Sequence, residues 1–162
     1  PCPCGYRGHS RRPCLCSPQQ ATRALARPSG PLLARTALHV SVPPVDPIAL
    51  SSPTLAESSA SVRLRVLAAR ERARQRARTL GLSATVNASL SDAELDRVVV
   101  LDAESRAFLE HAVTTLGLSA RAFTRIRRVA RSIADLEGDR EVRAAHVAEA
   151  IQGRLVDKTL SA

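Results

Sequence analysis

Four cysteines lie close together at the start of the sequence, in two C-x-C pairs. Cys2 and Cys4 form the first pair, and Cys14 and Cys16 form the second after nine intervening residues. Four thiolates can hold one tetrahedral Zn²⁺ and close a small loop that has no hydrophobic core of its own. The spacing within each pair is tighter than the common C-x-x-C arrangement, so free thiols or a redox pair remain alternatives. We expect a structural zinc site, with His9 inside the loop as a bystander.

A second chemically distinctive segment, residues 63–78, is crowded with arginine. It contains one acid, Glu71, and seven arginines: Arg63, Arg65, Arg70, Arg72, Arg74, Arg76 and Arg78. Such a segment can contact nucleic acid through its phosphates without reading bases. Aromatic residues for stacking are absent from it, so a solvated basic surface is the alternative. Elsewhere in the sequence, no Ser-His-Asp arrangement and no pair of acids stands at catalytic spacing.

Length and composition narrow the class of protein. The 162 residues carry 24 Lys+Arg against 15 Asp+Glu, a formal net charge of +9, which favours polyanionic partners. Only one of the basic residues is a lysine, Lys158, a skew that looks like the codon bias of a GC-rich genome. No apolar run is long enough to span a bilayer and no charged leader precedes an apolar stretch. We therefore expect no membrane partner and a cytoplasmic location, where clustered cysteines point to metal rather than to disulfides.

The elements that must position these residues are expected to be mainly helical. Residues 1–30 have the composition of knuckles and loops, Leu38, Val40 and Val42 alternate as in a half-buried strand, and residues 43–57 are a linker rich in Pro and Ser. A basic helix then runs from Ser58 or Ser59 to Leu80, mostly solvated because its apolar stripe is thin.

Four further helices form a compact bundle. Ser91 with Glu94, Asp102 and Ser119 are expected to cap the first three, Gly117 and Gly138 to end the second and third, and the last helix to run from about Glu141 to Gln152. The expected buried face of the helix capped by Asp102 comprises Ala103, Ala107, Phe108, Ala112 and Leu116. The expected core comprises Phe108, Phe123, Ile126, Val129, Ile133, Val147 and Ile151.

Three segments together resemble the magnesium-chelatase-like AAA+ family, and its ComM/YifB branch in particular. They are the cysteine segment from Pro1 to Pro18; the run from Ser29 to Arg35 that leads into Leu38-His39-Val40 and Val42-Pro43-Pro44-Val45; and the stretch from Gly117 to Ile151. The resemblance implies a six-membered ATPase ring that uses ATP with Mg²⁺. It also implies that the phosphate-binding loop and the magnesium carboxylates lie upstream of this chain, which contains no Met and opens on Pro1. We therefore expect a fragment that is inactive alone.

The resemblance also assigns roles to two arginines. Arg35 matches the arginine finger that reaches into the neighbouring subunit's nucleotide site, a role that suits a planar guanidinium. Ala34 and Ala37 replace the acids that usually flank it, which puts its orientation in doubt, and a salt-bridging surface arginine is the alternative. Arg121 matches the lid arginine that senses nucleotide in its own subunit, with Arg125 as its rival. Phe123 and Thr124 replace the Tyr-Asp that is usual there.

The expected organisation is a Cys-rich zinc-knuckle-like loop at 1–20, the end of the AAA+ core and a linker at 21–57, and a helical lid domain at 58–162. A DNA-remodelling motor, acting in branch migration or as a helicase in transformation and recombination, is the leading functional hypothesis. The oligomer would be a homo-hexamer and DNA its partner. The alternatives are a magnesium chelatase subunit that inserts metal into tetrapyrroles, and a non-catalytic remnant.

Overall fold

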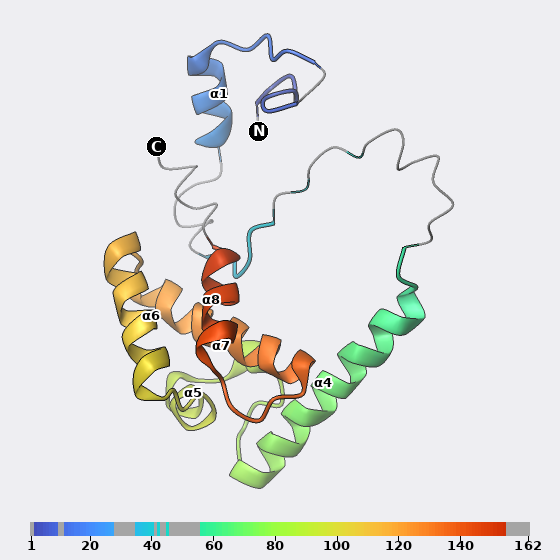
Figure 1. Ribbon diagram of the computed structural model, residues 1–162, viewed down its shortest axis with the longest axis vertical. Coiled ribbons are helices and arrows are strands. Elements are labelled where there is room, and N and C mark those ends of the chain that lie inside the picture. The colour runs from blue at the N-terminus through green and yellow to red at the C-terminus, as the bar shows by residue number, and fades with distance from the viewer. Residues whose placement is uncertain are drawn as a thin grey trace. The chain divides into compact units, whose positions relative to one another are not determined.

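The chain divides into two units, which are described separately. The computed structural model describes residues 2–9, 12–27, 35–40, 42, 45 and 56–154. One unit comprises residues 1–53 with 155–162, and the other comprises residues 54–154. All regular secondary structure in the described ranges is helical, which confirms the expected mainly α class (Figure 1). None of the helices described is both long and apolar enough to cross a membrane.

In the first unit a short helix, α1 (Pro18–Leu25), directly follows the cysteines. Its start is set by Ser17, whose hydroxyl accepts a hydrogen bond from the Gln20 backbone N–H at 3.2 Å, while the Gln20 side chain accepts one from the Ser17 N–H at 2.9 Å. Pro18 occupies the first turn, where a missing N–H costs nothing. Ala21 is buried. The α1 helix is therefore anchored immediately after Cys16.

The predicted strand at residues 38–42 is wrong for the part of it that the structure describes. Residues 38–40 and 42 form no strand, and Leu38, Val40 and Val42 are exposed. A strand is stable only when a neighbouring strand pairs with its backbone N–H and C=O groups. Because no other described segment is a strand, the alternating pattern has no partner.

The second unit contains five α-helices and one short 3₁₀ turn among its described residues. In chain order they are α4 (Ser59–Leu80), η1 (Asn87–Ser89), α5 (Asp92–Val98), α6 (Ala103–Leu116), α7 (Ala120–Glu137) and α8 (Ala144–Gln152). The helix α7 is central, because it contacts α4, η1, α5 and α8, and α6 also packs on α8 (Figure 1).

Side-chain caps and glycines set the helix boundaries much as the sequence predicted. Ser58, Ser91, Asp102 and Ser119 each accept a hydrogen bond from a backbone N–H in the first turn of the helix that follows. Gly81, Gly117 and Gly138 end α4, α6 and α7 in the left-handed conformation that glycine adopts without strain. The last helix, α8, begins at Ala144, three residues later than expected.

The core of this unit lies among α5, α6, α7 and α8. Its fully buried members include Leu95, Leu109, Ile126 and Val147. Alanines at positions 130, 134 and 150 are also fully buried, which brings the helix backbones close together. Ile126, Val147 and Ile151 confirm the predicted core, while Phe123, Val129 and Ile133 are partly buried against it.

The predicted buried face of α6 is wrong in its N-terminal half, whereas the predicted Ala112 and Leu116 in its C-terminal half are partly buried against the core. Phe108 is 41% exposed, and Ala103 and Ala107 are also exposed. The buried positions are instead Ser105 and Leu109, with Leu116 partly buried two turns later. The buried residues lie at helical spacing, but the polar Ser105 interrupts the apolar pattern of the buried face. Ala103, Ala107 and Phe108 make the exposed face look more apolar than the buried one.

The basic helix α4 is solvated only in part. Val62, Leu64 and Leu67 in its N-terminal half are exposed, as expected. Ala73 and Ala77 in its C-terminal half are buried, in the part of the unit where α4 contacts α7. Small side chains permit the close approach of the two helices.

Candidate functional site

The four cysteines converge in space. The Cys2, Cys4 and Cys14 sulfurs lie between 3.4 and 3.6 Å from one another, and the Cys16 sulfur joins them with all four within 4.8 Å. A disulfide needs a separation of about 2.05 Å, so all four are free thiols. In a tetrahedral site with Zn–S bonds of about 2.3 Å, neighbouring sulfurs stand about 3.8 Å apart. The cluster therefore has the size and donor set of a four-thiolate metal site.

Tight turns and the α1 cap place the sulfurs. The Gly5 N–H donates to the Cys2 carbonyl at 3.0 Å, and Gly5 has φ of 79°, which strongly favours glycine. His9 is not part of the group of possible ligands. Its Nδ1 accepts a hydrogen bond from the Arg12 N–H at 3.2 Å, and its ring meets Tyr6 edge-on.

The pKa values of the Cys4 and Cys16 thiols are shifted in opposite directions. A hydrogen bond from the Tyr6 backbone lowers the pKa of Cys4 to about 6. A hydrogen bond from the Cys4 backbone acts in the same direction on Cys16, but the adjacent Cys4 sulfur and burial outweigh it and raise the pKa of Cys16 to about 12. Four adjacent thiolates repel one another, and a divalent cation at their centre removes that repulsion. The arrangement is thus suited to a cation rather than to four free thiolates.

The two arginines singled out by the resemblance belong to different units. Arg35 is exposed, in the first unit. Arg121 is exposed in the first turn of α7, and Arg125, one turn later on the same face, is half-buried. Residues 28–34, which include Ala34, lie outside the described residues. The structure therefore brings the four cysteines together and shows each arginine within its own unit.

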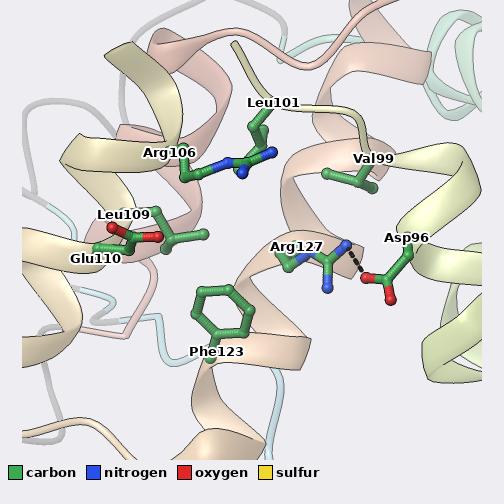
Figure 2. A pocket seen from close by; sticks show the side chains of 8 residues that line it. All are labelled: Asp96, Val99, Leu101, Arg106, Leu109, Glu110, Phe123 and Arg127. Atoms are coloured by element: carbon green, nitrogen blue, oxygen red, sulfur yellow. Dashed lines mark hydrogen bonds and ion pairs between the residues drawn. The ribbon is translucent and has the colours of Figure 1, made fainter. Parts of the chain in front are cut away.

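A pocket of about 320 Å³ opens between α5, α6 and α7 (Figure 2). The Arg127 guanidinium lies 5.5 Å from the centre of the Phe123 ring and donates to an Asp96 carboxylate oxygen at 2.6 Å. The remaining lining residues are Val99, Leu101, Arg106, Leu109 and Glu110. Each residue of a helix turns about 100°, so Phe123 and Arg127 face away from Arg121 and Arg125. The pocket is therefore separate from the face of α7 that carries Arg121 and Arg125.

One buried acidic residue in the second unit, Asp135, was missed by sequence reasoning. Asp135 on α7 is 2% exposed and accepts hydrogen bonds on its two oxygens from both terminal nitrogens of Arg76, at 2.7 and 2.8 Å. Asn87 donates to it at 2.8 Å and the fully buried Arg131 at 3.0 Å. Burial raises the pKa of Asp135, but these hydrogen bonds and the arginine charges outweigh burial and hold the pKa below its ordinary value.

This hydrogen-bond network joins α4, η1 and α7, together with the residues that follow α7. Arg131 also donates to the Asp139 and Arg140 carbonyls, which follow α7, at 2.6 and 2.7 Å. The i,i+4 spacing of Arg131 and Asp135 is a local sequence pattern that indicates an ion pair along one helix. No local signal links Arg76 to Asp135, because they are 59 residues apart.

A second polar cluster links α7 to α8. The Nδ1 atom of His146 accepts from the Arg143 N–H at 2.9 Å, which leaves the proton on Nε2. That atom lies 2.9 Å from a Glu137 oxygen and 3.5 Å from an Asp139 oxygen. The cluster holds the start of α8 against the end of α7.

Comparisons with known proteins agree with the helical architecture. Residues 56–154 match the family described as magnesium chelatase, subunit ChlI C-terminal, and residues 1–50 match magnesium chelatase, subunit ChlI. The chain is 39% identical over 162 residues to protein YifB of Salmonella typhimurium. The aligned region covers 99% of this chain and 30% of that relative. The chain is also 40% identical over 145 residues to competence protein ComM of Haemophilus influenzae. That aligned region covers 89% of this chain and 27% of ComM.

The chain thus spans less than a third of the length of these relatives. The C-terminal match alone covers more than half of the chain, and it coincides with the unit whose core and polar networks are described above. The chain belongs to the magnesium-chelatase-like AAA+ family, and YifB and ComM are among its relatives.

Proposed function

We propose that this chain is the C-terminal part of a ring-forming, cytoplasmic ATPase motor that remodels DNA. The observation that carries the proposal is the exposed basic surface of α4, where Arg63, Arg70, Arg74 and Arg78 face solvent. A relative of this chain is a competence protein, which agrees with a role on DNA. The family's ring arrangement would place several such surfaces around one DNA molecule.

ATP with Mg²⁺ would be bound only in part by this chain. The sequence has a single lysine, Lys158, which follows no glycine-rich loop, so the phosphate-binding lysine must come from elsewhere. Arg121 suits the lid role because an exposed cation at the N-terminal end of α7 adds to the positive end of the helix dipole. Arg35 would act in the site of a neighbouring subunit. Bound ATP supplies the phosphoryl group, and these side chains stabilise its charge.

The cysteine cluster would hold zinc as a structural ion. Its support is the fit of four sulfurs to a tetrahedral site, in a loop that has no hydrophobic core beyond Ala21 and Cys2 among its described residues. The ion would stabilise the turn that leads into α1.

Substitutions in the full-length protein test the two arginine roles. Arg35→Ala should abolish most ATP turnover and leave ATP binding nearly unchanged, because a finger acts mainly on the transition state. Arg121→Ala should weaken both, and the exposed Arg140→Ala is the matched control. Binding by a fluorescent ATP analogue and turnover by phosphate release separate the effects. Equal loss of binding from both variants would contradict the assignment, and a loss from Arg125→Ala alone would transfer the lid role to Arg125.

DNA remodelling is tested with a labelled four-way junction. The full-length protein should convert it to duplex products only with hydrolysable ATP, and its mass in solution with ATP should be that of a hexamer. A protein that hydrolyses ATP at the same rate with and without DNA, and leaves the junction intact, would contradict the proposal. Metal insertion would then be the better hypothesis.

A further inference from the structure

Six of the seven arginines of α4 fall into two groups with different surroundings. Arg72 donates to the Asp135 carbonyl at 2.8 Å, and Arg76 makes its paired hydrogen bonds to the Asp135 carboxylate. These two side chains attach α4 to α7. Arg72 is also exposed, but its guanidinium is held by that carbonyl. Arg63, Arg70, Arg74 and Arg78 are exposed and lie outside the Asp135 network.

The four exposed arginines form a single row along the helix. Successive residues turn by about 100°, so these four positions fall within about 80° of one another around the helix axis. Arg63 and Arg78 are 15 positions apart, which corresponds to about 22 Å at about 1.5 Å per residue. Leu67, 44% exposed, fills the gap between the first two. We call these four side chains the arginine row.

The row keeps its positive charge. The one acid on α4, Glu71, lies 3.5 Å from a terminal nitrogen of Arg74, and both side chains are about half exposed. An exposed pair of this kind is worth little and is readily exchanged for a stronger anion. The other three members of the row therefore remain available along the same face.

The chemistry of the row fits a phosphodiester backbone better than a protein surface. Guanidinium groups bind phosphate oxygens through two parallel hydrogen bonds. Phosphates of one strand follow each other about every 3.4 Å along a duplex axis, so a row of about 22 Å runs past about six of them. The row contains no aromatic side chain. Of the large exposed apolar residues of α4, only Leu67 lies within the sector of the row, and it does not by itself form the apolar centre of a protein interface. Contacts of this kind do not read base sequence.

We propose that the arginine row binds the backbone of DNA, while Arg72 and Arg76 fix α4 to α7 so that a bound strand moves with the helical unit. The proposal rests on the DNA-remodelling function and assigns the surface that would carry it. It also gives six of the seven arginines of α4 different tasks, because Arg72 and Arg76 are hydrogen-bonded to Asp135 and the four members of the row are not. Arg65, which is paired with Glu57 at 2.7 Å, belongs to neither group.

The test compares two triple variants of the full-length protein that lose the same charge. Arg70→Gln, Arg74→Gln and Arg78→Gln remove most of the row. Arg65→Gln, Arg106→Gln and Arg140→Gln remove three exposed arginines outside it. Affinity for a labelled duplex is measured by fluorescence anisotropy over a salt series, without nucleotide, and thermal melts show that both variants are folded.

Loss of the row should flatten the plot of log affinity against log salt by about 0.9 for each contact, or about 2.7 for three. The control should keep the wild-type slope, and a duplex of different sequence should give the same results. Equal slopes for the two variants would overturn the inference, because net charge alone, or another surface, would then account for binding. A wild-type protein that binds no DNA at all would overturn the proposed function as well.

Discussion

At the scale of single residues, the Asp135 side chain joins α4 and η1 to α7 through hydrogen bonds from Arg76 and Asn87. It is 2% exposed and forms ion pairs with Arg131, which is fully buried, and with Arg76, whose side chain is 18% exposed. Asp135→Ala leaves these charges unpaired, so we expect a loss of about 3–5 kcal/mol in the free energy of unfolding. Urea unfolding followed by circular dichroism measures it.

The control for this prediction is Glu57→Ala. Glu57 pairs with Arg65, but both side chains are about half exposed, so the expected loss is below about 1 kcal/mol. Similar losses for the two variants would show that the Asp135 network contributes no more than a surface pair.

Glu94 predicts a dependence of stability on pH. Hydrogen bonds from the Ser91 backbone and hydroxyl, and from Ser83, lower the pKa of Glu94 from 4.5 to about 2. A group with a lowered pKa in the folded state stabilises the fold above its ordinary pKa and loses this effect as the pH falls. The difference in stability between wild type and Glu94→Gln should therefore be full at neutral pH and shrink between about pH 4.5 and 2. Urea unfolding at several pH values measures it, and Glu149→Gln, on the exposed side of α8, should show no such trend.

At the scale of elements, α6 offers adjacent residues with opposite surroundings. Leu109 is 1% exposed, while Phe108 is 41% exposed. Leu109→Ala should cost about 2–5 kcal/mol because it leaves a cavity in the core. Phe108→Ala should change the free energy of unfolding by less than about 1 kcal/mol. If thermal melts ranked the two in the opposite order, the face of α6 that packs on the core would be misassigned.

At the scale of the whole molecule, the cysteine cluster predicts one zinc ion per chain. Protein purified under reducing conditions without chelator should contain about one equivalent by elemental analysis. Cys4→Ser with Cys14→Ser should lower this to near zero because only two thiolates remain. His9→Ala should leave it unchanged, since His9 is not among the converging groups. Protein free of zinc under these conditions would sink the assignment.

The sequence was a good guide wherever the signal is local. Ser91 with Glu94, Asp102 and Ser119 start their helices and Gly117 and Gly138 end theirs, because a cap or a left-handed residue acts within one turn. The spacing of Cys2, Cys4, Cys14 and Cys16 likewise pointed to their convergence, because turns within a loop of this length bring such pairs together.

Only the tertiary structure decided which faces are buried and which charges are paired. Ser105 lies in the core and Phe108 does not, because the choice of face depends on where α8 passes α6 rather than on residue type. Arg76 and Arg74 are alike in the sequence, yet one is held by Asp135 and the other is exposed. The alternation of Leu38, Val40 and Val42 predicted a strand that the described residues do not form. Each of these outcomes depends on a partner distant in sequence, and a local pattern contains no information about that partner.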